Sequence, residues 1–164
     1  MSHMAELSIS KANRELWLFG LLKIPMIFYC RPRIVAMDYE SVTVMIPLRR
    51  RTRNHLGSMY FGALAVGADI AGGFLAFTLA RQQKLSMSLA FGSFKVDFLK
   101  RPESDVYFYC PSGALVAEMF ETSQKTGERQ NRNVSIVAYT LQGSERTEVA
   151  TFELGLSMKV KVKS

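Results

Sequence analysis

The segment from Met59 to Ala80 constrains the fold more than any other feature, because it is rich in helix-forming residues and apolar on every side. Asp69 is its only charged residue. A surface helix is apolar along one stripe, whereas a helix that is apolar all round is buried. We therefore expect a buried central helix from about Ser58 to Arg81, with Ser58 as its N-cap.

The central segment also contains many glycines, although each costs roughly 0.5–1 kcal/mol relative to alanine in a helix interior. Small side chains allow a helix to lie very close to its surroundings, as a sheet wrapped around the helix would require. Gly62, Val66, Asp69 and Gly73 recur at helical spacing and share one stripe. Because the two glycines leave room beside the carboxylate, this stripe indicates a narrow ligand channel.

Two apolar segments raise the question of a membrane span. In the central segment, a charged Asp69 near the middle of a bilayer would cost about 2.5–3.5 kcal/mol. The earlier segment, Leu16 to Cys30, is short for a bilayer and is interrupted by Lys23 and Pro25. We expect no membrane span, and an N-terminal helical segment at residues 10–30, broken near Pro25, that packs on the domain. Binding of this segment to a membrane surface is the alternative.

The rest of the chain consists of strand-like pairs and one short helical segment at 114–123. Strands are expected at 34–37, 42–48, 94–98 (with one buried face), 105–110, 134–141 and 148–159. Adjacent strand pairs imply an antiparallel sheet, so the predicted class is α+β, with the sheet wrapped around one long helix. We expect a single domain over residues 1–164, in which residues 1–4 are a cloning remnant.

The net charge of +7 is concentrated in Arg49–Arg53 and in the tail Lys159–Lys163. Basic runs favour phosphate-bearing partners, and a solvated face is the alternative for each run. No helix-turn-helix or RNA-binding motif accompanies them, so nucleic acid is not the expected partner. Cys30 and Cys110 form no CxxC or Cys/His cluster, which predicts neither a disulfide nor a metal site and favours the cytoplasm.

Asp69 is the candidate functional carboxylate. A buried carboxylate must be paired, hydrogen-bonded or raised in pKa. An Asp that caps a loop or pairs with an arginine is the structural alternative, and structural ion pairs also perturb pKa values. The room beside Asp69 makes a functional role as reasonable as a structural one.

Two motifs resemble the signature of hotdog-fold acyl-CoA thioesterases, in particular those of the phenylacetate-pathway type. That signature has an Asn, a Gly three residues later, a His-Gly-Gly, and then a helix that reaches an Asp or Glu seven residues past the last Gly. Asn54, Gly57, Gly62 and Asp69 fall on it in register. The later run Phe94–Pro102 resembles the strand of this family that ends in a Phe-Leu-Arg-Pro-like turn. The expected order of helices and strands matches that of this family over most of the chain.

The resemblance implies a hotdog domain that hydrolyses an acyl-CoA thioester, in a homodimer or dimer of dimers with the site at the subunit interface. Asp69 would be the general base or nucleophile, the Gly62 N–H would polarise the thioester carbonyl, and Asn54 would position the substrate or water. No metal or separate cofactor is implied, since coenzyme A enters with the substrate. The implied substrate-binding residues are Gly57, Tyr60, Phe61, Val66, Gly73 and the basic Arg53, Lys100 and Arg101.

The chain departs from this signature where Tyr60-Phe61 replaces His-Gly. Phe61 keeps a backbone N–H, but its bulk would block close approach of a substrate or redirect the channel. Tyr60 would replace the hydrogen-bonding His in part, and His55 is a second candidate for that role. This departure motivates the alternative of a non-catalytic hotdog protein that binds acyl-CoA or a lipid.

Overall fold

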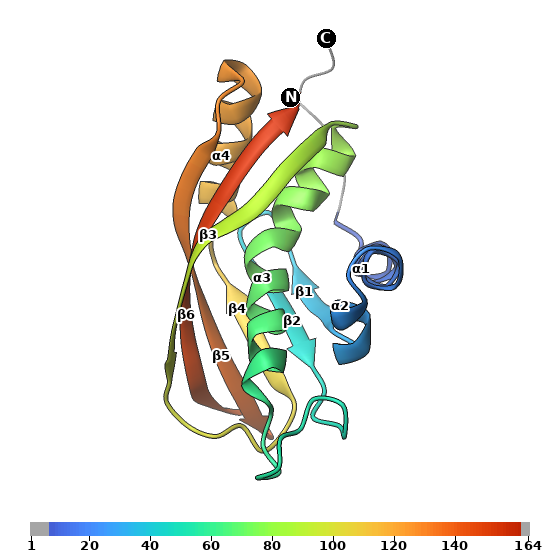
Figure 1. The fold of residues 1–164 in the computed structure, drawn as a ribbon, viewed down its shortest axis with the longest axis vertical. Coiled ribbons are helices and arrows are strands. Elements are labelled where there is room, and N and C mark those ends of the chain that lie inside the picture. Colours follow the sequence, from blue (N-terminus) through green and yellow to red (C-terminus); the bar gives the residue numbers. More distant parts are fainter. Residues whose placement is uncertain (1–6, 162–164) are drawn as a thin grey trace.

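A six-stranded antiparallel sheet curves around the long central helix α3 in the computed structural model, which describes residues 7–161 (Figure 1). The sheet order is β1-β2-β4-β5-β6-β3. The strands are β1 (Arg33–Met37), β2 (Val42–Ile46), β3 (Ser86–Phe98), β4 (Val106–Cys110), β5 (Gln130–Gln142) and β6 (Glu145–Lys161). The helices are α1 (Ile9–Leu22), α2 (Pro25–Cys30), α3 (Phe61–Gln82) and α4 (Gly113–Thr126). The expected cloning remnant and the last lysine of the basic tail lie outside the described residues.

The predicted α+β class and the sheet wrapped around one helix are confirmed. The backbone of α3 lies against β4 at Gly67, where an added Cβ would overlap the ring of Phe108. Phe108 is fully buried and packs near Phe152 of β6, with 6.2 Å between the ring centroids. Among the described helices, α3 is the one long and apolar enough to cross a membrane, but 72% of its most apolar window is buried inside the protein. Helix α3 therefore has the burial of a core helix.

The start of α3 differs from the prediction. The helix begins at Phe61 instead of Ser58, and its N-cap is Tyr60, whose side chain makes no capping bond. The preceding residues are held extended, because the Met59 N–H donates to the carbonyl of Pro102 (2.8 Å) and the Tyr60 N–H to that of Thr52 (2.7 Å). The first bond joins the loop before α3 to the loop after β3, and the second lies within the loop before α3.

Strand β3 is longer than predicted, and its expected buried face is wrong for the single chain. Phe94 and Phe98 are 47% and 55% exposed. Strand β3 pairs with β6 along one side and forms the edge of the sheet. Helix α3 packs most closely on β2 and β4, away from this edge, so the aromatic face of β3 is left uncovered.

The N-terminal segment forms two helices, as predicted, with Pro25 at the start of the second. Helix α1 packs on α2 and β1 and lies beside α3 in Figure 1. The Asn13 side chain fixes it there: its amide donates to the carbonyl of Ile34, and its oxygen accepts from the Ile34 N–H, both at 2.8 Å. Asn13 thus satisfies the backbone of the edge strand β1 where no further strand pairs with it.

Exchange of Asn13 for alanine is expected to lower the free energy of unfolding by about 1–3 kcal/mol, because both Ile34 groups lose their partner. The midpoint of urea denaturation measures the change. Arg14→Ala, at an exposed position of the same helix, is the matched control. Equal midpoints for Asn13→Ala and the control would contradict this role.

Candidate functional site

The two larger pockets along α3 lie beside its C-terminal half and beside its N-terminus. The first has a volume of about 350 Å³ and is enclosed by α1, the start of α2, α3 and β3; we name it the α1–α3 pocket. The second has a volume of about 500 Å³ and lies between residues 54–64 and residues 98–102; we name it the loop pocket. The α1–α3 pocket lies between these two helices because α1 packs mainly on α2 and β1.

The wall of the α1–α3 pocket is apolar along most of its length. Phe19 of α1 and Phe77 of α3 contact each other there, with 5.4 Å between ring centroids, and β3 contributes Leu89 and Phe91. Gly73 keeps the pocket open toward β3, since a Cβ added to it would lie 3.1 Å from Leu89. The pocket therefore has the lining that an apolar ligand requires.

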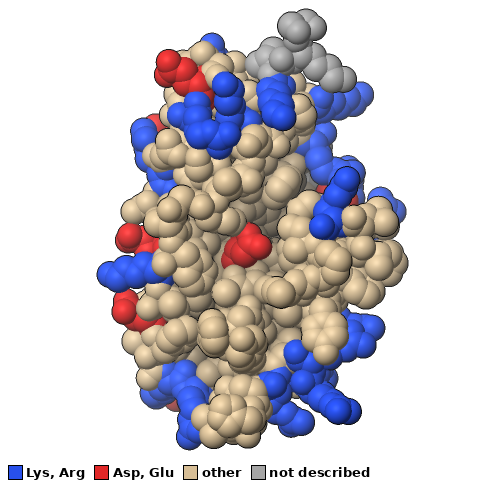
Figure 2. Space-filling model, viewed as in Figure 1, with Lys and Arg blue, Asp and Glu red and all other residues tan. Residues whose placement is uncertain are grey.

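Asp69 is the first residue of α3 that lines this pocket. Desolvation raises the pKa of its carboxyl from an ordinary 3.8 to about 6. Within residues 7–161, no hydrogen bond or ion pair compensates that desolvation. Figure 2 shows one acidic group in the middle of this face, surrounded by uncharged atoms. The structural alternative, in which Asp69 caps a loop or pairs with an arginine, therefore does not hold for the described residues.

A raised pKa makes Asp69 a cost to stability at neutral pH. Between pH 4 and 6 the folded protein binds more protons than the unfolded chain at this site, so stability falls as the pH rises through this interval. Two pKa units correspond to roughly 3 kcal/mol, or about 2 kcal/mol after a discount for partial solvation. Asp69→Asn is therefore expected to raise Tm by about 5 °C at pH 8 and to have little effect at pH 4.

Thermal unfolding followed by circular dichroism at both pH values measures this difference. Glu118→Gln removes a carboxylate from the exposed side of α4 and serves as the control. A lower Tm for Asp69→Asn than for wild type at pH 8 would show that the carboxylate has a stabilising partner.

The loop pocket contains most of the remaining predicted site residues. The Asn54 side-chain oxygen accepts hydrogen bonds from the N–H groups of Leu56 (2.9 Å) and Ser58 (3.2 Å), so it holds the loop in shape. Gly57 completes this turn with a positive φ of 82°, which favours glycine. Asn54 therefore has a structural role through its oxygen, and its Nδ2 group donates to none of the described residues.

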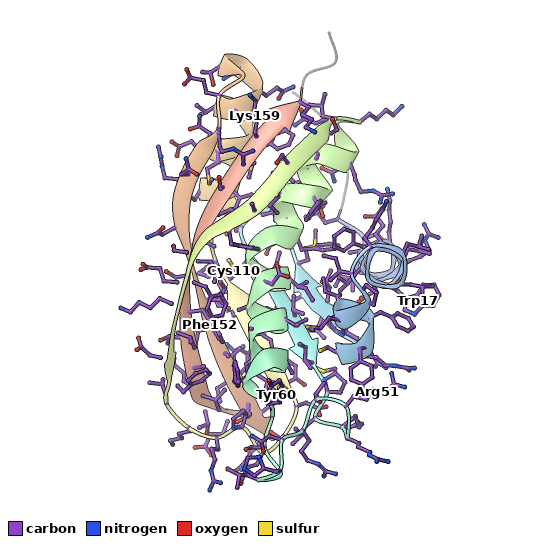
Figure 3. All side chains as sticks on the ribbon, in the orientation of Figure 1. Trp17, Arg51, Tyr60, Cys110, Phe152 and Lys159 are labelled. Atoms are coloured by element: carbon purple, nitrogen blue, oxygen red, sulfur yellow. The ribbon has the colours of Figure 1, made fainter. Side chains whose placement is uncertain are left out.

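Tyr60 and Phe61 cover the beginning of α3. Their rings lie against each other, with 4.8 Å between centroids, and the Tyr60 ring occupies the space beside Gly62 where a side chain would project. Phe61 is 62% exposed. The Gly62 N–H is in the first turn of α3, where N–H groups have no acceptor within the helix. In Figure 3 Tyr60 lies at the lower end of α3.

The basic residues at this end of the molecule are exposed. Arg53, Lys100 and Arg101 have no salt bridge within the described residues, whereas Arg49 contacts Asp105 at 3.5 Å. Arg51 lies over the ring of Tyr29, 5.3 Å from its centroid (Figure 3). Figure 2 shows positive charge gathered around this lower end. The loops at this end can therefore meet an anionic group without first breaking internal ion pairs.

The predicted site residues thus fall into separate groups. Asp69 and Gly73 line the α1–α3 pocket, whereas Asn54, Tyr60, Phe61, Lys100 and Arg101 line the loop pocket. Gly57, Gly62, Val66 and Arg53 line neither. The channel beside Asp69 therefore runs toward the C-terminal end of α3, away from Gly62 and Val66.

Several residues of the α1–α3 pocket were not predicted from the sequence. Glu15 and Arg81 form a salt bridge of 3.5 Å across it, between α1 and the last turn of α3. No local pattern marks these residues, because they are far apart in the chain. Within residues 7–161, no three His, Cys, Asp or Glu side chains are grouped in a way that would hold a metal ion.

Comparison with known proteins establishes the family. A family model described as a domain of unknown function, DUF4442, matches residues 13–154. No curated protein matches the chain.

Solved structures share the fold at low sequence identity. A protein of unknown function from Chlorobaculum tepidum has a TM-score of 0.78 and 14% identity, over 94% of this chain and 98% of that chain. A thioesterase family protein from Silicibacter pomeroyi has a TM-score of 0.64 and 19% identity, over 94% and 100%. A thioesterase from Haemophilus influenzae has a TM-score of 0.58 and 13% identity, over 93% and 91%. With a helix enclosed by an antiparallel sheet and a match over residues 13–154, this chain has the hotdog fold of thioesterase family proteins and belongs to the DUF4442 family.

Proposed function

We propose that this protein is a cytoplasmic thioesterase that hydrolyses acyl-CoA as a homodimer. One observation carries the proposal: a desolvated carboxylate, Asp69, lines an apolar pocket and has no partner among the described residues. An acyl chain in the α1–α3 pocket would place its thioester next to this carboxylate. The description of structural neighbours as thioesterases supports the same chemistry.

The chemistry needs a base or a nucleophile, and Asp69 meets that need. With a pKa of about 6 it is ionised at neutral pH and is a stronger base than an ordinary aspartate. As general base it takes a proton from water, whose oxygen attacks the thioester carbonyl carbon. The tetrahedral intermediate then releases coenzyme A as its thiolate, and the acyl group leaves as a carboxylic acid. Direct attack by the carboxylate, followed by hydrolysis of the anhydride, is the second route.

A second copy of the chain would complete the site. In one chain, Asp69 and the Asn54–Gly62 loop are not in one pocket. Strand β3 is an open edge with exposed Phe94 and Phe98, and an uncovered apolar edge favours pairing with another strand. In an antiparallel pair of β3 strands with Phe94 near the two-fold axis, Phe91 of one copy lies opposite residue 97 of the other. The α1–α3 pocket of each copy then adjoins the loop pocket of its partner.

In this dimer the loop pocket would receive the thioester carbonyl and the coenzyme A. The Gly62 N–H, at the N-terminus of α3, is a donor for the developing oxyanion. The exposed Arg53, Lys100 and Arg101 are candidates for the coenzyme A phosphates, because their charges are not neutralised within the described residues. Asn54 contributes its Nδ2 group, since its oxygen is occupied by the loop.

A non-catalytic acyl-CoA-binding or lipid-binding protein is the second candidate. The position of Tyr60 favours it, because the ring fills the space beside Gly62 and crowds the expected oxyanion donor. Such a protein would keep the apolar pocket and the basic loops, and lose only the reaction.

An assay of thiol release distinguishes the two candidates. It compares wild type with Asp69→Ala on a panel of acyl-CoAs that runs from acetyl to palmitoyl and includes aromatic acyl groups. The thioesterase requires hydrolysis by wild type that is lost in the variant. Acyl-CoA binding in a calorimeter without thiol release would establish the binder instead. Absence of both would contradict the thioesterase and the acyl-CoA binder, and would leave lipid binding to be tested.

A further inference from the structure

Charged groups line the far end of the α1–α3 pocket, where the Arg81 side chain is 66% exposed. Along α3, Asp69 is the first lining residue and Arg81 the last. Arg81 reaches across to Glu15 of α1 at 3.5 Å, and the Glu15 side chain is only 14% exposed. A carboxylate that is this buried next to an apolar cavity is held there by its cation, since burial of an unpaired charge is unfavourable. Trp17, by contrast, is on the outer side of α1, away from the pocket (Figure 3).

A smaller cavity of about 80 Å³ lies directly behind this ion pair. It is enclosed by the first turns of α1 and the last turn of α3, with the polar residues Ser8, Lys11 and Gln82 in its wall. Glu15, Thr78 and Arg81 line both cavities, so these three side chains are the partition between them.

We infer that the Glu15–Arg81 ion pair is the end wall of the acyl-binding pocket and limits the substrate to acyl chains of medium length. The inference rests on the proposed function, which places the acyl chain in this pocket. Arg81 is the twelfth residue after Asp69, which places it about 18 Å farther along the helix axis. Because each carbon–carbon bond of about 1.5 Å advances an extended chain by about 1.3 Å, the pocket accepts about twelve to fourteen carbons.

Chain-length profiles of wild type and Glu15→Ala test this wall, with straight-chain acyl-CoAs from C4 to C18. Wild type is expected to have its highest kcat/KM near C12 and to lose at least 10-fold by C18. In Glu15→Ala the cavity behind the wall becomes accessible over about one helical turn, or about 5 Å, so the optimum shifts by about four carbons. Glu15→Ala with Arg81→Ala is the second variant, since it leaves neither charge unpaired.

Two controls separate the volume of the wall from its charge and from general effects. Glu15→Gln keeps the size of the side chain without its charge. A profile as in wild type would assign the wall to the volume of the side chain, and a longer limit would assign it to the ion pair with Arg81. Arg14→Ala removes a cation from the outer side of the same helix and is expected to have no effect on chain length. Melting temperatures of all variants identify any that fail to fold.

The outcomes distinguish this inference from the proposed function. Hydrolysis by wild type with the same chain-length profile in both wall variants overturns the end wall and leaves the thioesterase intact. If wild type hydrolyses no acyl-CoA, calorimetric titration with free fatty acids from C8 to C18 decides instead. A longer limit for binding in Glu15→Ala supports the wall without catalysis; the same limit, or no binding of fatty acids at all, overturns it.

Discussion

Asp69→Asn is expected to lower kcat for acyl-CoA hydrolysis by about 10²- to 10⁴-fold, the contribution of a general base. The amide has nearly the shape of the carboxylate, so the apolar pocket is unchanged and the affinity for substrate stays within a few-fold. In wild type, kcat/KM is expected to rise with pH through about 6, because Asp69 acts in its ionised form. The variant should retain a small residual rate without this rise.

Initial rates of thiol release between pH 5 and 8 give both parameters. Glu118→Gln, on the exposed side of α4, should keep the kinetics and pH profile of wild type. A variant with normal kcat and a raised KM would mean that Asp69 contributes to binding alone. An unchanged inflection near pH 6 in Asp69→Asn would assign the titration to another group.

Phe94→Asp combined with Phe98→Asp is expected to convert the dimer into monomers and to reduce hydrolysis by about 100-fold. The two side chains are about half exposed in the single chain. Phe94 also contacts the buried Phe152, with 5.8 Å between ring centroids, so the Tm of the double variant is measured beside its oligomeric state. In the proposed dimer Phe94 and Phe98 are buried, and four carboxylates next to the two-fold axis repel one another. Hydrolysis is expected to fall with dissociation because, in the proposed dimer, the oxyanion donors would come from the partner. Loss of one such donor costs about 10²- to 10³-fold in kcat.

Analytical ultracentrifugation together with the kinetic assay measures both effects. Leu22→Asp, at a position of α1 that is 70% exposed, is the matched control for a charge placed on an apolar surface. It should leave the dimer and the rate unchanged. A wild-type monomer with full activity, or an active double variant that sediments as wild type does, would contradict a site completed by the β3 edge.

The sequence by itself determined the class of the fold and the identity of its central helix. A segment that is apolar on every side and rich in small residues has few arrangements other than burial inside a sheet, and α3 occupies that place. In the last strand, Phe152, Leu154, Leu156 and Met158 alternate along the sequence and so share one face, and all four are buried. Asp69 was singled out because a charge in such a helix needs a reason, and that reasoning requires no knowledge of distant contacts.

Tertiary structure decided what surrounds Asp69. The stripe from Gly62 to Gly73 indicated a channel along that stretch of α3. The pocket instead lies between α1 and the C-terminal half of α3, and it extends from Asp69 toward Arg81. The same holds for the start of α3. Ser58 has the residue type of an N-cap, but the backbone bonds from Met59 to Pro102 and from Tyr60 to Thr52 keep the chain extended. Alternation in the sequence predicted that Phe94 and Phe98 are buried, yet both are exposed. Whether an alternating face is covered depends on which strand lies at the edge of the sheet. Helix and strand periodicity arises from neighbours along the chain, whereas pocket walls and sheet edges arise from residues brought together only by folding.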